Sequence, residues 1–346
     1  MYIPVVPQET TVPVNTPAPW SRNSEWVALP TVTAGDQKFV GLYAVWNTDS
    51  NFVALTVAGR YTVDWGDGTP TENIASGVSA EHNYVFTALA SSTLTSEGFR
   101  QAIITVTMRL GDNFTSLNLQ DIHSQAGLVS GLSTCWLDIR HDGASMTTLT
   151  VGGTSPVRHS MLEQYEFVGS SSLTSAASKF SNCRKLGSVV GTSWTSGCNT
   201  FTTMFTGCTS LQTIPLLNTA LGNTFTSMFT SCSSLQTIPL LNTAAGNTFT
   251  SMFNGCTSLQ TIPSLVTTSG TTMTTMFNSC SSLKVGAMTG TKATISYASC
   301  ELSGTELDAI YTALGDGTGQ TITVTPNWGT ATDDPTIATA KNWTVV

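Results

Sequence analysis

The sequence predicts a mainly β protein in three parts: an antiparallel β-sandwich, a repeat solenoid with a parallel sheet and short helical turns, and a small α/β cap. Short alternating apolar runs separated by turn residues predict the first part. A Cys-x-x-Leu pattern with a period near 24 predicts the second, because repeats of fixed period are typical of stacked units. One amphipathic helix after the last repeat predicts the third.

The expected boundaries follow these changes in pattern. Residues 1–24 are rich in Pro, Thr and Val and are expected to form an extended arm. Residues 25–115 hold the runs "KFVGLYAVWN", "NFVALTV", "GRYTVDWGDGT" and "QAIITVTMRL", which alternate as the strands of an antiparallel sandwich do. Residues 116–301 are assigned to the solenoid, and residues 302–346 to the cap.

The repeats keep their phase over more than one hundred residues. Leucines begin successive units at spacings of 24, 25, 24, 24 and 24, namely Leu162, Leu186, Leu211, Leu235, Leu259 and Leu283. A cysteine precedes each leucine from Leu186 on by three residues, and His159 stands at that place before Leu162. We therefore expect a core ladder of side chains in register, which includes Cys183, Cys208, Cys232, Cys256, Cys280, Phe205, Phe229, Phe253, Phe277, Leu211, Leu235 and Leu259.

Within one unit, the segment "LQTIPLL" is expected to be a short strand with alternate apolar residues pointing inward. The segment "FTSMF" is expected to form one helical or 3₁₀ turn that buries Phe225, Met228 and Phe229. Asn and Gly in "AAGN" are expected to bend the chain back. Residues 186–283 contain no Asp, Glu, Lys, Arg or His, which avoids repulsion between identical stacked charges.

The cysteines allow two interpretations. Stacked equivalents would lie about 4.8 Å apart, which is within the Cα range of a disulfide, so bridges between units are one alternative. A buried column of thiols that bond to the turn backbone is the other, and the one we expect. Zinc spacing is absent from the pattern.

The ends of the solenoid also carry signals. In "SGTELDAIYTALG", Ser303 and Glu306 form a capping box, and the helix is expected to end before Gly315. "TITVT" and "NWTVV" are expected to be closing strands, while "SLNLQDI", "CWLDIR" and "TTLTV" are expected to be entry strands.

Two clusters of ionisable residues invite a functional interpretation. Asp64 and Asp67 in "DWGDGT" suggest a calcium loop, but the remaining ligands are missing, and Asp-Gly between strands first predicts a hairpin turn. "LDIRHDG" gathers Asp138, Arg140, His141 and Asp142, and we expect a solvated, salt-bridged strand end there. No nucleophile motif or nucleotide fingerprint is present, so we expect no enzyme, no catalytic residue and no cofactor.

Composition excludes several partners. Only 10% of residues are charged and the net charge is −8, so we expect neither nucleic acid nor an anionic membrane as a partner. No apolar run approaches the ~18 residues that a spanning helix needs. The N-terminus lacks the basic and apolar regions of a secretory signal, so we expect folding in the cytoplasm with reduced cysteines.

Two families resemble parts of this sequence. "C-x-x-L-x-x-I-P-x-L" followed by "F-x-x-x-F-x-x-C" resembles the BspA-type leucine-rich repeats over roughly residues 160–300. That resemblance implies a curved solenoid of surface and adhesive proteins, without catalytic residues. "VDWGDGT", "EHNY" and "AIITVTM" resemble the PKD-type Ig-like sandwich over about residues 25–110, which implies a spacer or interaction module.

The combination of Pro-rich arm, Ig-like module and Thr/Ser-rich repeats looks like a tailed-phage virion protein. It implies a multicopy, non-enzymatic component of the virion surface, either capsid decoration or part of a tail fibre. Other virion proteins would then bind the N-terminal region, and a host glycan or protein would be a further partner. The alternative is a bacterial cell-surface adhesin that binds glycan or protein through the Thr/Ser-rich face.

Overall fold

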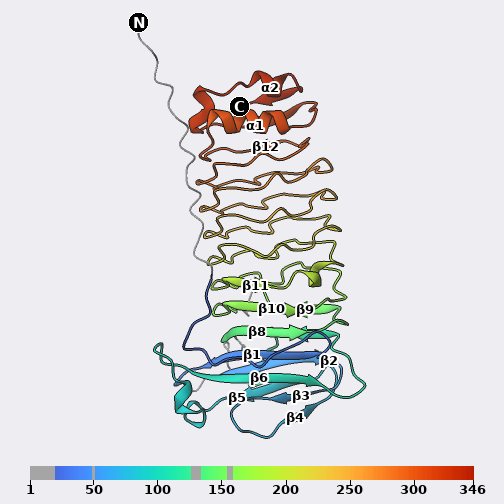
Figure 1. Cartoon of the computed structure of the whole chain (residues 1–346), viewed down its shortest axis with the longest axis vertical. Helices are drawn as coiled ribbons and strands as arrows, with labels where there is room; N and C mark the ends of the chain where they lie inside the picture. Colours follow the sequence, from blue (N-terminus) through green and yellow to red (C-terminus); the bar gives the residue numbers. More distant parts are fainter. Residues whose placement is uncertain (1–19, 49–50, 126–133, 154–158) are drawn as a thin grey trace.

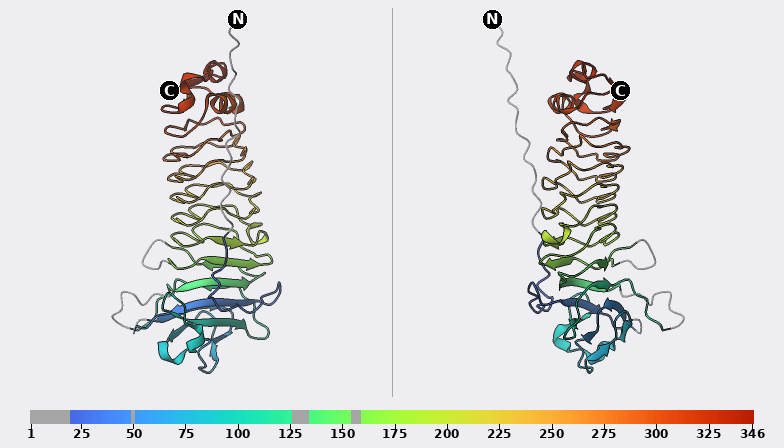
Figure 2. Two further views of the ribbon diagram at one scale, coloured as in Figure 1. Left: turned by 60° about the vertical axis from the view of Figure 1, so that its left-hand side comes forward. Right: turned by 90° about the vertical axis from the view of Figure 1, so that its right-hand side faces the viewer.

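The chain is mainly β, and its repeats lie one above another between a two-sheet base and a helical cap (Figure 1). The computed structural model describes residues 20–48, 51–125, 134–153 and 159–346. Of the arm predicted for residues 1–24, only residues 20–24 belong to this described part. Two further views show the repeats continuing in one direction from the base to the cap (Figure 2).

The strands form three sheets. A seven-stranded sheet has the order β11-β10-β8-β1-β6-β3-β4, a four-stranded sheet β5-β2-β7-β9, and a three-stranded sheet β12-β13-β14. The strands are β1 (Lys38–Val45), β2 (Phe52–Ala58), β3 (Tyr61–Asp64), β4 (Glu72–Ile74), β5 (Ser79–Asn83), β6 (Arg100–Met108), β7 (Ser116–Asn118), β8 (Trp136–Asp142), β9 (Thr148–Thr150), β10 (Gln164–Val168), β11 (Ser188–Val190), β12 (Ile295–Ser296), β13 (Gln320–Thr323) and β14 (Trp343–Val345). The helices are α1 (Gly304–Ala313) and α2 (Thr336–Thr339), with 3₁₀ turns η1 (Phe86–Ala88), η2 (Ser91–Thr93), η3 (Ser193–Thr195) and η4 (Trp328–Ala331).

The base and the repeats share two sheets. In the larger one, β1 pairs antiparallel with β6 and with β8, whereas β8 pairs parallel with β10, and β10 with β11. In the smaller one, β2 pairs antiparallel with β7, and β7 pairs parallel with β9. Backbone hydrogen bonds in both of these sheets therefore cross the boundary expected between residues 115 and 116.

Strand β1 has two buried faces. Phe39, Tyr43 and Val45 point into the main core, which continues through the repeats to the cap. Val40, Leu42 and Ala44 point the other way, as the period of two requires, and are covered by Trp26, Leu29 and Val32 of the segment that precedes the strand. Residues 20–32 therefore act as a strap over the outer face of the sheet.

From residue 174 to residue 289 the repeats follow one pattern, and we call each 24-residue unit a rung. Parallel bridges join equivalent residues, as in the column Thr200, Thr224, Thr248 and Thr272. Two columns of aromatic rings run through the rungs. In the longer one, Phe180, Phe205, Phe229, Phe253, Phe277 and Tyr297 stack at centroid distances of 5.5, 5.6, 5.5, 5.6 and 4.8 Å.

The strand predicted for "LQTIPLL" is wrong in its period. Leu235, Ile238 and Leu241 are buried, so every third residue points inward, whereas a strand buries every second one. Leu240, which lies between two of them, is 61% exposed. In residues 200–289 the expected extended sheet is reduced to isolated bridges.

The turn predicted for "FTSMF" is present, since the Met228 N–H donates to the Phe225 carbonyl at 3.2 Å, but its conformation is not helical. Ser227 and Ser231 have φ values of 55° and 61°, which a right-handed helix excludes. The Phe229 N–H donates to the Met252 carbonyl of the next rung at 2.8 Å instead of closing a helical bond. Successive tight turns thus bury the predicted Phe and Met while the backbone bonds to its neighbours.

The cap closes the last rung as the sequence predicts. The Ser303 side chain accepts from the Glu306 N–H at 3.3 Å, and Leu307, Ile310 and Tyr311 of α1 are buried in the main core. The closing strands correspond to β13 and β14, and the entry strands to β7, β8 and β9.

Phe229→Ala should lower the free energy of unfolding by about 3–5 kcal/mol, because it removes a fully buried ring between two stacked neighbours. The matched control is Thr226→Ala, which removes one hydroxyl hydrogen bond to Thr248 and should cost at most about 1 kcal/mol. Guanidinium unfolding followed by circular dichroism measures both. Equal losses would contradict the stacked core.

Candidate functional site

Between residues 186 and 283 the outer face of the rungs carries no charge. Its polar groups largely bond to one another, and Leu216, Leu221 and Leu240 are also exposed there. The Ser251 and Thr275 hydroxyls lie 2.7 Å apart, and the Asn278 amide donates to the Asn254 carbonyl oxygen at 3.1 Å. Both pairs join equivalent positions of adjacent rungs. A ligand on this face would therefore meet repeated hydroxyl and amide columns rather than one distinct cluster.

The predicted ladder residues lie inside the rungs. All twelve have no exposed surface: Cys183, Cys208, Cys232, Cys256, Cys280, Phe205, Phe229, Phe253, Phe277, Leu211, Leu235 and Leu259. Each ladder thiol from Cys208 to Cys280 donates to a phenylalanine carbonyl of the preceding rung, as Cys232 does to Phe205 at 3.1 Å. These side chains build the scaffold and do not face a ligand.

All cysteines are free thiols in the structure, and burial changes their acidity. It raises the pKa of the Cys183 thiol to about 12 and that of Cys198 to about 11. Because the thiolate is the reactive form, thiols of this kind are poor nucleophiles. The cysteine column therefore agrees with the expected buried thiols and not with disulfides between rungs.

A second buried column was missed by sequence reasoning. Thr219, Thr243, Thr267 and Thr291 are at most 1% exposed. Their hydroxyls bond across rungs, as when Thr243 donates to the Val266 carbonyl at 2.7 Å. The signal was present, because these threonines recur every 24 residues directly after an apolar-rich run, but threonine was assigned to the outer face.

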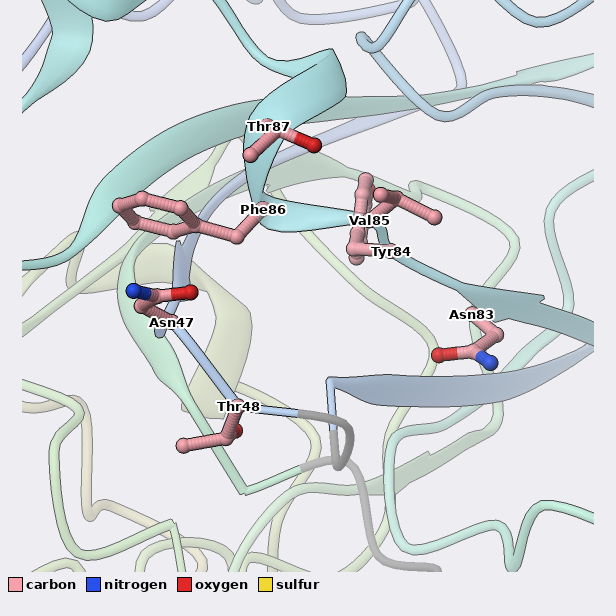
Figure 3. A pocket seen from close by; sticks show the side chains of 7 residues that line it. All are labelled: Asn47, Thr48, Asn83, Tyr84, Val85, Phe86 and Thr87. Atoms are coloured by element: carbon pink, nitrogen blue, oxygen red, sulfur yellow. The ribbon is translucent and has the colours of Figure 1, made fainter.

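A hollow in the base lies beside η1 and was also not predicted (Figure 3). Asn47 and Thr48, after β1, form one side, and Asn83, at the end of β5, forms another. Phe86 and Thr87 of η1 close it. These residues come from two separate segments, 47–48 and 83–87, and carry no motif that a single sequence could reveal.

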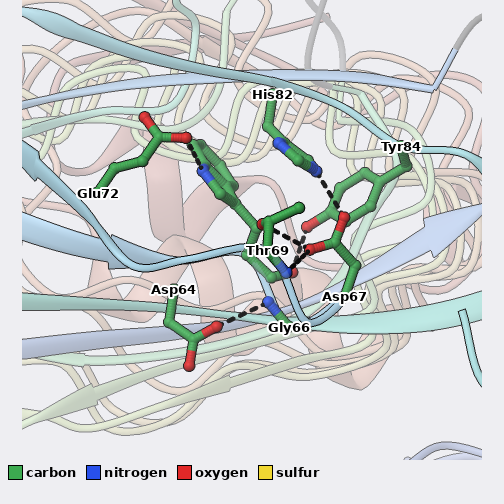
Figure 4. A network of polar contacts seen from close by, with 8 residues as sticks. Asp64, Gly66, Asp67, Thr69, Glu72, His82 and Tyr84 are labelled. Carbon is green, nitrogen blue, oxygen red and sulfur yellow. Dashed lines mark hydrogen bonds and ion pairs between the residues drawn. The ribbon is translucent and has the colours of Figure 1, made fainter. Parts of the chain in front are cut away.

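The "DWGDGT" segment forms the β3–β4 hairpin turn, and its acidic groups are used within the turn (Figure 4). Asp64 accepts from the Gly66 N–H at 2.9 Å, and Asp67 accepts from the Thr69 N–H at 3.0 Å. His82 Nε2 lies 2.8 Å from the other Asp67 oxygen, and its ring stacks on Trp65.

This network accounts for the charge of Asp67. Burial alone would raise the pKa of its carboxyl, but the hydrogen bonds from Thr69 and His82 hold the pKa below its ordinary value. Among the described residues, no group of three or more His, Cys, Asp or Glu side chains is arranged to hold a metal ion. Asp64 and Asp67 thus serve the turn.

The "LDIRHDG" cluster is not a solvated strand end, contrary to the prediction. Strand β8 lies between β1 and β10, and Asp138, His141 and Asp142 are at most 1% exposed. Asp138 pairs with Arg22 of the strap at 2.7 Å, and Asp142 accepts from the Gly35 N–H at 3.0 Å. The cluster therefore anchors the segment that covers the sheet.

Two of these buried groups have shifted pKa values. Burial raises the pKa of the Asp138 carboxyl, although Arg22 opposes the shift. Burial lowers the pKa of His141 to about 3, and its Nε2 lies 2.6 Å from the Tyr165 hydroxyl. His141 is therefore neutral in the folded chain at neutral pH.

Residues 174–289, about a third of the chain, match the family model described as "Mycoplasma protein of unknown function, DUF285". The match falls on the rungs. No curated protein and no solved structure matches the chain. In the described part, neither helix is long and apolar enough to cross a membrane.

Acidification should destabilise the protein through His141. Its folded pKa of about 3 lies below the ordinary 6.5, so only the unfolded chain gains this proton as the pH falls below 6.5. The free energy of unfolding should decrease by about 1.4 kcal/mol for each pH unit below 6.5, which amounts to about 2 kcal/mol at pH 5. Urea unfolding at pH 7 and pH 5 measures the loss.

His141→Gln should reduce this pH dependence, whereas His123→Gln, at a less buried imidazole, should leave it in place. A His141→Gln protein with the same loss between pH 7 and pH 5 as the parent would contradict the assignment.

The thiols should react with Ellman's reagent only after unfolding. Every cysteine except Cys135 is buried, so the native protein should react slowly at pH 8. In guanidinium without reductant all eight thiols should react. Fewer than eight would indicate disulfides, and rapid reaction of the native protein would contradict the buried column.

Proposed function

We propose that the protein is a non-enzymatic structural component of a tailed-phage particle surface, as capsid decoration or part of a tail fibre. In this proposal residues 116–301 form a leucine-rich-repeat solenoid of the BspA type that displays its uncharged face. Residues 25–115 form a PKD/Ig-like module that binds other virion proteins. The chain would be present in many copies.

One observation carries the proposal: the interior of the rungs is occupied by side chains that contact their own equivalents. The ring column from Phe180 to Tyr297 is continuous, and Cys232 and Thr243 bond to neighbouring rungs. Such an interior supports a stiff projecting element, because each rung is stabilised chiefly by its two neighbours.

The two sheets that the base and the rungs share also support this proposal. Because β8 and β7 hydrogen-bond to β1 and β2, the rungs are joined to the base through backbone ladders on two walls. A linker with few contacts would let the repeats swing, whereas two shared sheets hold the displayed face in a fixed direction relative to the base.

A second candidate is a bacterial cell-surface adhesin. The family match over the rungs favours it, since that family is related to BspA-like repeat proteins. In this case the Thr/Ser-rich face would bind a glycan or a protein of another cell, through many weak contacts repeated along the rungs.

Location separates the two candidates. Particles from a lysate of the strain that carries the gene are banded on a density gradient and analysed by quantitative mass spectrometry. We expect this chain to band with the major capsid protein at a fixed ratio, while a host ribosomal protein serves as the contamination control.

Absence of the chain from the particle band would overturn the virion proposal. Antibody labelling of intact cells in the same culture would then test the adhesin, with labelling expected only if the face is displayed there.

A further inference from the structure

The hollow beside η1 has the size and lining of a site for one small ligand (Figure 3). Its volume is about 290 Å³, near the lower end of the ~300–1,000 Å³ typical of ligand pockets. Besides Val85, six polar or aromatic residues line it, namely Asn47, Thr48, Asn83, Tyr84, Phe86 and Thr87.

The walls of the hollow are fixed by groups outside it. The Asn51 carboxamide accepts from the Trp46 N–H at 2.8 Å and donates to the Trp46 carbonyl at 2.7 Å, which holds the turn that presents Asn47. Arg100 donates to the carbonyls of Phe86 and Leu89 at 3.0 and 2.7 Å. A site held in this way loses little conformational entropy when a ligand binds.

The same arginine orients the aromatic wall. Its guanidinium carbon lies 4.5 Å from the centroid of the Phe86 ring, a cation–π contact that limits the ring's rotation. The ring is half-buried and borders the hollow beside Asn47 (Figure 3). It therefore offers an apolar surface next to polar groups.

Two of the polar side chains at the hollow, the carboxamides of Asn47 and Asn83, are neutral and available. Within the described residues, the side-chain carboxamides of Asn47 and Asn83 make no hydrogen bond, and each offers one acceptor and two donors. Among the described residues that line the hollow, no side chain is charged. These residues offer no counter-charge to a lone anion or metal ion, whereas a neutral molecule with many hydroxyls finds both donors and acceptors.

We propose that this hollow binds one neutral sugar unit of a glycan. The carboxamides of Asn47 and Asn83 hydrogen-bond the hydroxyls, and the Phe86 ring packs against the C–H face of the sugar ring. The volume accommodates one unit, so a longer glycan continues outward from the open side. The inference does not depend on whether the chain belongs to a particle or to a cell surface.

Saturation-transfer difference NMR on the full-length protein tests the site with methyl glycosides of glucose, galactose, mannose and N-acetylglucosamine. Irradiation of the aromatic protons should transfer saturation to the ring protons of at least one sugar, because Phe86 lies against it. Titration of that sugar gives the dissociation constant.

Variants locate the binding. The double variant N47A/N83A should weaken it about tenfold or more, and Phe86→Leu should also weaken it, because the flat ring that packs against the sugar is lost. The matched control is N218A/N242A, which removes two exposed asparagines from the rungs and should leave the affinity unchanged. Thermal unfolding confirms that each variant folds.

Two results would overturn the proposal. One is saturation transfer to none of the four sugars. The other is sugar binding that N47A/N83A leaves intact, or that N218A/N242A weakens equally, which would place recognition on the rungs instead.

Discussion

Each rung must pack against a near copy of itself, and this constraint decides which side chains the repeats can hold. An ionised group stacked on its equivalent would repel it at close range, which explains why residues 186–283 contain none. Flat rings tolerate self-stacking, and offset stacking contributes about 0.5–1.5 kcal/mol per pair beyond burial. Cys232 and Thr243 satisfy the constraint differently, because each donates to a backbone carbonyl of a neighbouring rung.

A stack of rungs leaves unpaired backbone groups at its two ends, and the chain closes them by different means. At the end next to the base, β8 pairs antiparallel with β1 on one side and parallel with β10 on the other. The pairing of the sheet therefore changes from antiparallel to parallel at this strand. At the far end, Tyr297 continues the ring column and α1 covers the last rung. Both devices prevent edge-to-edge association of open strands.

The fold class, the repeat phase and the cap could be predicted because each rests on local pattern. The capping box at Ser303 needs only four residues, and the ladder at Phe229 needs only its period. The shape of a rung could not be predicted, because the choice between two-residue and three-residue spacing at Ile238 depends on bonds to the next rung. The burial of Asp138 depends on β1 and on the strap, which lie more than ninety residues away in the sequence. His141 is buried among the rings of Phe114, Tyr165 and Phe167, which come from three other segments.

The outer face of the rungs and the hollow in the base also differ in how far local sequence pattern can predict them. The outer face of the rungs repeats, so its columns can be read from the sequence, but repetition also means that no rung offers a ligand a unique set of groups. Asn47 comes from one segment and Asn83 and Phe86 from another, and the two segments meet only in the folded base. In a protein whose repeats present the same groups many times over, discrimination between similar ligands must come from the parts that do not repeat. In the proposed division of roles, the repeats provide reach, rigidity and number, and the base provides the distinct contact.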